Sequence, residues 1–188
     1  MNDNFIEKIK EFDARLFASY RSARFHEVEA RLDELLALAG NVDEKDHVLD
    51  MLVNHFHFIR EPLRAGRALA ERIALSPDLV EAWIGLTEHY HYHEEDIEKA
   101  AETVEIAFQK ALAKNRQVRQ VLGARIRIAL KRKDYAAINN SLSMLLTYEL
   151  PQGGFDVALE RDFIPQIPLE ATTNDILMRY KELAKPKV

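Results

Sequence analysis

The chain has 188 residues, the size of one domain or of two small ones, and 47% of them are hydrophobic while 30% are charged. This composition is typical of a globular chain that can bury a core. The absence of cysteine excludes a disulfide framework, a cysteine-ligated zinc site and a thiol nucleophile. The net charge of −5 disfavours a nucleic-acid binder, whose surface is normally basic.

We expect neither a targeting signal nor a membrane span in this sequence. The opening residues "MNDNFIEKIKEF" lack the apolar run of a signal peptide. No stretch approaches the roughly 18–20 apolar residues that cross a bilayer. We therefore expect a cytoplasmic protein without a membrane partner.

Apolar residues recur at helical spacing from the N-terminus to about residue 150. The first segment places Phe5, Ile9 and Phe12 on one stripe. The next, "VEARLDELLALAG", repeats this spacing and ends at a glycine, a common helix stop. Two helices joined by a short turn are therefore predicted for the first part of the chain.

Further along, "SPDLVEAWIGLTEHY" runs into "VEIAFQKALAKN", and together they resemble the tetratricopeptide repeat family. The repeat unit of that family is a helical hairpin with the motif W-x2-L-G-x2-Y on its first helix and A-x3-F-x2-A on its second. The matching residues are Trp83, Leu86 and Tyr90, with Thr87 in place of glycine, and then Val104, Phe108 and Ala111, with valine in place of the first alanine.

Steps of about 34 residues in either direction from Trp83 find related apolar patterns, as expected of a repeat array. We therefore predict four hairpins, at about 9–42, 46–79, 80–118 and 119–152. The third hairpin holds about five extra residues, which we place at "HYHEEDIEK" between its two helices.

The C-terminal part departs from this pattern. Prolines and glycines between residues 151 and 168 exclude one continuous helix, and an extended apolar piece is expected there. A final helix is predicted from about residue 173, with Ile176, Leu177, Tyr180 and Leu183 as its buried stripe. This part caps the last hairpin or, alternatively, occupies a groove of its own chain or of a second copy, which would make the protein a homo-oligomer.

The resemblance implies an all-α fold in which α-α hairpins stack into a right-handed superhelical solenoid. About four hairpins and a C-terminal capping helix are expected. Residues 1–152 would form the repeat domain, and residues 153–188 would belong to the same domain. The alternative is a non-repetitive helical bundle with the same apolar spacing.

Two short stretches repeat each other one period apart, "NHFHF" at 54–58 and "EHYHY" at 88–92. Phe56 and Tyr90 take the aromatic packing position of the family, so they are expected in the core. The resemblance implies that the residues just beyond them face the concave groove. The predicted groove residues are Asn54, His57, Phe58, Glu88, His91, Tyr92, Arg127 and Lys131.

The favoured function is a non-catalytic interaction module that binds a peptide or protein partner in this groove. No nucleophile motif, glycine-rich phosphate loop or paired-carboxylate spacing is present, so we predict no catalytic residue and no cofactor. Some family members clamp acidic C-termini of chaperones with Lys, Asn and Arg, but only Asn54 stands at a plausible clamp position here. The partner is therefore left unidentified.

Two alternative functions remain open. His89, His93 and Asp96 would come together on a continuing helix and could bind a divalent metal ion. The other alternative is a self-assembling structural module.

Charge is divided into blocks, with nine acids and one base from Asp78 to Glu105 and nine bases and no acid from Lys110 to Lys133. Adjacent helices could neutralise each other, or the two signs could form a bipolar surface that steers an acidic partner or supports self-association. Nucleic-acid binding is disfavoured, because the bases spread around the helix.

Overall fold

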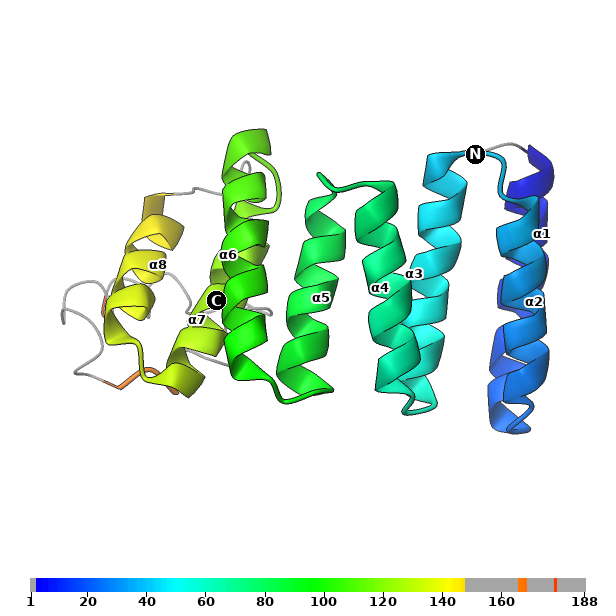
Figure 1. Ribbon diagram of the computed structural model, residues 1–188, viewed down its shortest axis with the longest axis horizontal. Helices are drawn as coiled ribbons and strands as arrows, with labels where there is room; N and C mark the ends of the chain where they lie inside the picture. The colour runs from blue at the N-terminus through cyan, green and yellow to red at the C-terminus, as the bar shows by residue number, and fades with distance from the viewer. Residues whose placement is uncertain (1–2, 148–165, 169–177, 179–188) are drawn as a thin grey trace, which may run out of the picture. The chain divides into compact units, whose positions relative to one another are not determined.

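A computed structural model describes residues 3–147, 166–168 and 178 of the chain. Within this part the fold is all-α, with eight α-helices and no strand (Figure 1). The helices are α1 (Asp3–Arg21), α2 (Phe25–Leu38), α3 (Val42–Phe58), α4 (Pro62–Leu75), α5 (Val80–Tyr92), α6 (Ile97–Lys114), α7 (Val118–Arg132) and α8 (Tyr135–Thr147).

None of these described helices has the length and apolar character needed to cross a membrane.

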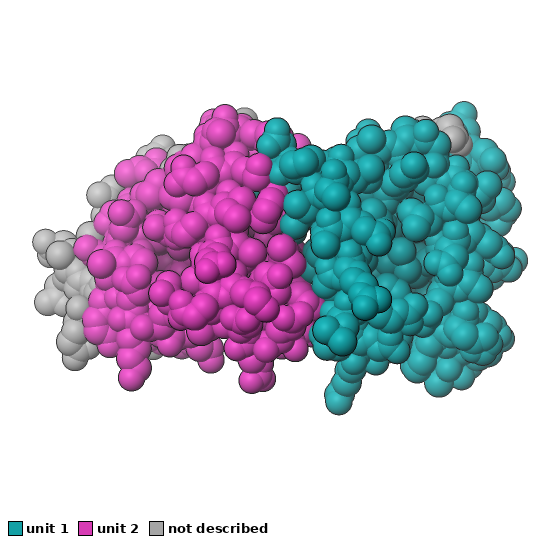
Figure 2. Space-filling model, viewed as in Figure 1, with its two compact units in different colours: residues 1–82 teal, residues 83–188 magenta. Residues whose placement is uncertain are grey.

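The chain divides into two compact units, residues 1–82 and residues 83–188 (Figure 2). Unit 1 holds α1 to α4 and the first residues of α5. Unit 2 holds the rest of α5 and α6 to α8.

Unit 1 is built on apolar stripes that the helical spacing places on one side of each helix. The first helix begins at Asp3, earlier than expected, because Phe5 extends its buried stripe by a further turn. Helix α2 packs against α1 and α3, and α3 lies beside α4. The core side chains include Phe5, Phe12, Val28, Leu32, Leu35, Val48, Leu52, Val53, Phe56, Ala65 and Leu69.

In unit 2, small residues let the helices approach closely. Ala100, Ala107 and Ala111 are fully buried along α6, which packs against α7. The hydroxyl of Thr87 on α5 donates a buried hydrogen bond of 3.1 Å to that of Thr103 on α6. Helix α7 in turn packs against α8. The buried side chains of these two helices include Val121, Leu122, Ile126, Ile138, Leu142 and Leu145.

The helix ends follow the chemistry of the sequence. Asn41 and Asp96 cap the N-termini of α3 and α6, where their side chains accept hydrogen bonds from the backbone of Glu44 and Lys99. Pro62 is the first residue of α4, a position where the missing N–H costs nothing.

The turn inside each helix pair contains a non-glycine residue with positive φ. These residues are Ala23 between α1 and α2 (φ 55°), Arg60 between α3 and α4 (φ 61°), Glu95 between α5 and α6 (φ 54°) and Lys133 between α7 and α8 (φ 57°). Positive φ reverses the chain over few residues and closes the tight turn.

The extra residues of the third segment do not form a long turn: only residues 93–96 separate α5 from α6, whereas α6 has 18 residues against the 14 of α4. The Asp96 cap starts α6 early, so the additional length is helical. The predicted final helix and most of the extended piece lie outside the described residues, although Ile167 is described and buried.

Candidate functional site

Four of the eight predicted groove residues come together in unit 2, on α5 and α7. Glu88 and His91 lie one turn apart on α5, and Arg127 and Lys131 lie one turn apart on α7. The guanidinium of Arg127 approaches the Glu88 carboxylate, with Nη2 and Oε1 separated by 3.9 Å. The two helices therefore present these side chains to the same region.

The charges of Arg127 and Lys131 also act on His91. Partial burial lowers the pKa of its imidazole, and the positive charges of Arg127 and Lys131 lower it further. Its neutral form is therefore favoured beside two cations. For Glu88, burial raises the pKa of the carboxyl group and Arg127 offsets only part of that effect.

Tyr92 adds an exposed aromatic ring at the end of α5. Its side chain is 55% exposed, and its ring centroid lies 4.2 Å from that of His91. We refer to Glu88, His91, Tyr92, Arg127 and Lys131 as the α5–α7 surface. It combines two cations, one carboxylate and two rings.

Other bases of α7 are paired with the acidic helix α6. Arg125 pairs with Glu105, and its guanidinium also lies 4.7 Å from the centroid of the Phe108 ring. Arg132 pairs with Glu98 at 3.2 Å. The opposite charge blocks of the sequence thus neutralise each other in part, along the contact between α6 and α7.

The other three predicted groove residues belong to unit 1, near the end of α3. Asn54 is exposed and donates a long hydrogen bond of 3.5 Å to Asp50 on its own helix, while His57 is partly buried. Phe58 is 58% exposed, and its ring centroid lies 4.3 Å from that of Tyr20 and 6.1 Å from that of Phe25. Phe58 therefore belongs to an aromatic cluster at the end of the first two helix pairs.

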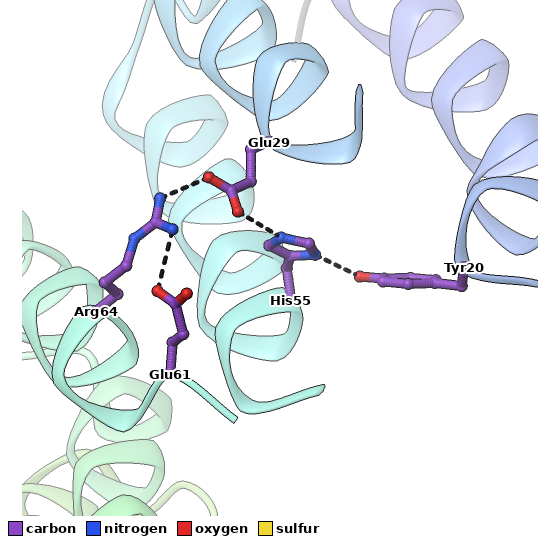
Figure 3. A network of polar contacts seen from close by, with 5 residues as sticks. All are labelled: Tyr20, Glu29, His55, Glu61 and Arg64. Atoms are coloured by element: carbon purple, nitrogen blue, oxygen red, sulfur yellow. Dashed lines mark hydrogen bonds and ion pairs between the residues drawn. The ribbon is translucent and has the colours of Figure 1, made fainter. Parts of the chain in front are cut away.

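A buried histidine lies beside this cluster and joins three helices (Figure 3). His55 on α3 is only 1% exposed. Its Nδ1 lies 2.9 Å from the hydroxyl of Tyr20 on α1, and its Nε2 lies 3.5 Å from the Glu29 carboxylate on α2. An imidazole protonated at Nε2 accepts from Tyr20 and donates to Glu29.

Arg64 completes this network from α4. It donates to Glu29 at 2.7 Å and to Glu61 at 3.1 Å. The hydrogen bond from Arg64 holds the pKa of Glu29 below its ordinary value. Burial lowers the pKa of His55 in spite of the neighbouring Glu29. A neutral imidazole beside an ionised carboxylate is therefore the favoured state.

His89 on α5 is a second buried histidine, on the stretch of sequence that resembles the one around His55. It is fully buried, and its Nε2 lies 2.9 Å from Glu94, which follows the end of α5. Of the histidines at 54–58 and 88–92, the sequence analysis assigned only His57 and His91 to the groove, and it did not predict the burial of His55 and His89. The repetition itself was the available signal, since a recurring polar residue marks a recurring structural position.

The three residues of the alternative metal site, His89, His93 and Asp96, do not form a set of ligands among the described residues. The hypothesis required one helix to continue through His89, His93 and Asp96, but α5 ends at Tyr92. Asp96 instead caps α6 and lies 3.1 Å from the Lys99 ammonium. In the described part of the chain, no three histidine or acidic side chains gather in a way that could hold a metal ion.

A cleft of about 330 Å³ lies in unit 1 between α1 and α2. Its walls include apolar Phe12, Leu16 and Leu35. Charged residues on its rim form local ion pairs three positions apart, in Lys8–Glu11, Arg24–Glu27 and Arg31–Glu34. It holds none of the predicted site residues and offers few convergent polar groups, so the α5–α7 surface is the stronger candidate site.

Comparison of the chain with protein-family models and with curated proteins finds no match, so the candidate site is interpreted from its own chemistry.

Proposed function

We propose that the chain is a non-catalytic interaction module of the tetratricopeptide type that binds a peptide or protein partner. In this proposal the helix pairs stack into a right-handed superhelical solenoid, and the partner contacts the α5–α7 surface. The motif residues around Trp83 support the repeat assignment, as do the recurring positions of His55 and His89. The lack of cysteine fits a reducing compartment, and we place the protein in the cytoplasm.

One observation carries the binding role: α5 and α7 bring side chains from distant parts of the sequence to one exposed surface. Tyr92 supplies an exposed ring that lies against the ring of His91, and Arg127 and Lys131 supply positive charges that act on His91. Aromatic and arginine side chains are frequent anchors at interfaces, because they bury much area for a small loss of conformational freedom. In this proposal Tyr92 is the apolar anchor and Arg127 is the polar anchor for a segment of the partner.

The burial of the two carboxylate-linked histidines supports a role without catalysis. His55 and His89 are 1% and 0% exposed, so a substrate does not reach their rings in this structure. Their carboxylate partners satisfy polar groups inside the fold, as buried polar groups require. The partly exposed His91 belongs to the proposed binding surface.

The test is a selection of peptides from a random library on the full chain, followed by affinity measurements on variants. The double variant with Tyr92→Ala and Arg127→Ala should bind the selected peptides with about a hundredfold lower affinity, since two interface anchors each contribute roughly 1–2 kcal/mol. Isothermal titration calorimetry measures the change.

The matched control is Arg132→Ala, which removes a cation of the same helix that pairs with Glu98 on α6. The affinity of this variant for the selected peptides should stay within about twofold of that of the parent chain, because exposed ion pairs contribute little free energy. If the selected peptides bind the Tyr92 and Arg127 double variant as tightly as the parent chain, the α5–α7 surface is not the binding site.

A further inference from the structure

The cations of α7 differ in how well the protein neutralises them. Arg125 and Arg132 pair with acids of α6. Arg127 meets Glu88 only across 3.9 Å, and Lys131 forms no ion pair with any residue that the structure describes. The positive charge directed toward α5 is therefore the less compensated part of this helix.

The contact between Glu88 and Arg127 is too long for a strong hydrogen bond. Charge-assisted N–H···O bonds are typically about 2.7–2.9 Å long, so the 3.9 Å separation leaves an attraction without a bond. Glu88 and Arg127 are 46% and 23% exposed, so water and incoming groups reach both. A better-placed anion could take the position of Glu88 beside Arg127.

We propose that the α5–α7 surface binds the acidic side chains of a partner peptide, with a carboxylate or phosphate held between Arg127 and Lys131 and Glu88 acting as an internal competitor. This inference rests on the proposed function and adds the chemistry of the ligand. Arg127 donates to the anion through its planar guanidinium, and Lys131 adds a compact charge one turn away. Tyr92 contacts the peptide beside the anchored group.

His91 reports occupancy of this position. The charges that act on it are Arg127 and Lys131 on α7, while Glu88 lies one turn earlier on its own helix. An anion bound between the two cations reduces their repulsion of a protonated imidazole, so it raises the pKa of His91. By linkage, a ligand that raises the pKa of His91 binds more tightly as the pH falls through that pKa.

The first experiment measures fluorescence anisotropy of labelled peptides with the full chain at neutral pH. The probes are a glutamate–glycine peptide, its glutamine counterpart, and the glutamine peptide carrying phosphoserines. Binding of the glutamate peptide, the phosphoserine peptide or both, without binding of the glutamine peptide, supports the proposal and identifies the source of the anion. Equal binding of all three peptides, or of none, overturns it.

The variants make the assignment specific. The double variant Arg127→Gln with Lys131→Gln should lower the affinity for the acidic peptide about tenfold. Glu88→Gln should raise this affinity roughly twofold to fivefold, as expected for partly exposed charge pairs. Arg132→Gln is the matched loss of charge and should change the affinity by less than about twofold. Loss of affinity in Arg132→Gln equal to that of the double variant, or no gain in Glu88→Gln, contradicts the site. Circular dichroism checks that each variant is folded.

A second readout separates this inference from the proposed function. NMR titration of His91, assigned with His91→Gln, should show a higher pKa in the presence of the acidic peptide than with the glutamine peptide. If library selection yields uncharged peptides that need Tyr92 and leave His91 unshifted, the interaction module stands and the anion site is rejected. If the acidic peptide shifts His91 but no library peptide is selected, the anion site stands and the broader peptide-binding role fails.

Discussion

At the scale of single residues, His55 shows how a buried polar group becomes part of a core. Leaving such a group without partners would cost roughly 1–3 kcal/mol. The fold avoids this cost by placing Tyr20 at Nδ1 and Glu29 at Nε2. The imidazole thereby connects three helices of unit 1.

Replacing His55→Ala should lower the free energy of unfolding by about 2–4 kcal/mol, because it creates a cavity and removes a partner from Tyr20 and Glu29. Urea denaturation measures the loss. The control is His26→Ala, an exposed histidine of α2, which should change stability by less than about 0.5 kcal/mol. A similarly small effect of His55→Ala would show that the network contributes little.

The same residue predicts a direction for the pH dependence of stability. The pKa of His55 is lower in the folded chain than its ordinary value of 6.5, so the unfolded chain binds more protons as the pH falls through 6.5. Stability should therefore decrease below that pH. The pKa of Glu29 is also lowered, from 4.5, which adds a second loss at more acidic pH.

Urea denaturation at a series of pH values tests this. The parent chain should lose stability between pH 6.5 and the lower pKa of the folded His55, and His55→Gln should lose less over that interval. Parallel pH profiles for the two proteins would contradict the assignment.

At the scale of helices, Arg72 joins α4 to α3. Its side chain is buried, and its guanidinium bonds to Asp46 at 2.9 Å and also to Asp50. Removing one side of a buried ion pair strands the other charge, and the effect depends on which charge remains. Here the carboxylates are the more exposed partners, with Asp50 47% and Arg72 only 7% exposed.

Replacing Asp46→Asn and Asp50→Asn together should therefore cost about 3–5 kcal/mol, because a buried Arg72 loses both anions. Arg72→Met should cost less, about 1–2 kcal/mol, because water can solvate the remaining carboxylates and methionine fills part of the volume. Chemical denaturation of the two variants gives the comparison. A larger loss in Arg72→Met would reverse this interpretation.

The helices themselves could be predicted from the sequence because helical spacing is a local property. The length of α6 could not, since it depends on Asp96 ending the turn as a cap. The polar network of His55 could not be predicted from local patterns either, because Tyr20 and Glu29 lie 35 and 26 residues from His55 in the sequence. Within the candidate site, the sequence predicted Glu88, His91, Arg127 and Lys131 as groove residues. The approach of Arg127 to Glu88, which lie far apart in the sequence, could be found only in the folded chain.

At the scale of the whole molecule, the division into two units predicts uneven effects of mutations. The main helix contacts within each unit join helices that follow each other in the chain, so a local loss of stability is expected to spread little. His55 and its partners all belong to unit 1. A change there should act first on α1 to α4.

Native-state hydrogen exchange of His55→Ala should therefore show lower amide protection in α1 to α4, with α6 to α8 close to the parent chain. Ser141 on α8 offers a converse probe, because its hydroxyl is buried without a hydrogen-bond partner among the described residues. Ser141→Ala should preserve or raise protection in α8. Equal losses throughout the chain in His55→Ala would show that both units unfold as one.

The turns leave room to make this protein more thermostable. Ala23, Arg60, Glu95 and Lys133 each hold a backbone conformation that a side chain disfavours by roughly 1–2 kcal/mol and that glycine adopts freely. A glycine also makes the unfolded chain more flexible, so each replacement should gain about 0.5–1 kcal/mol. The four turns are separate in sequence, and gains at independent sites usually add. A chain with all four glycines should melt several degrees higher, without any change to the α5–α7 surface.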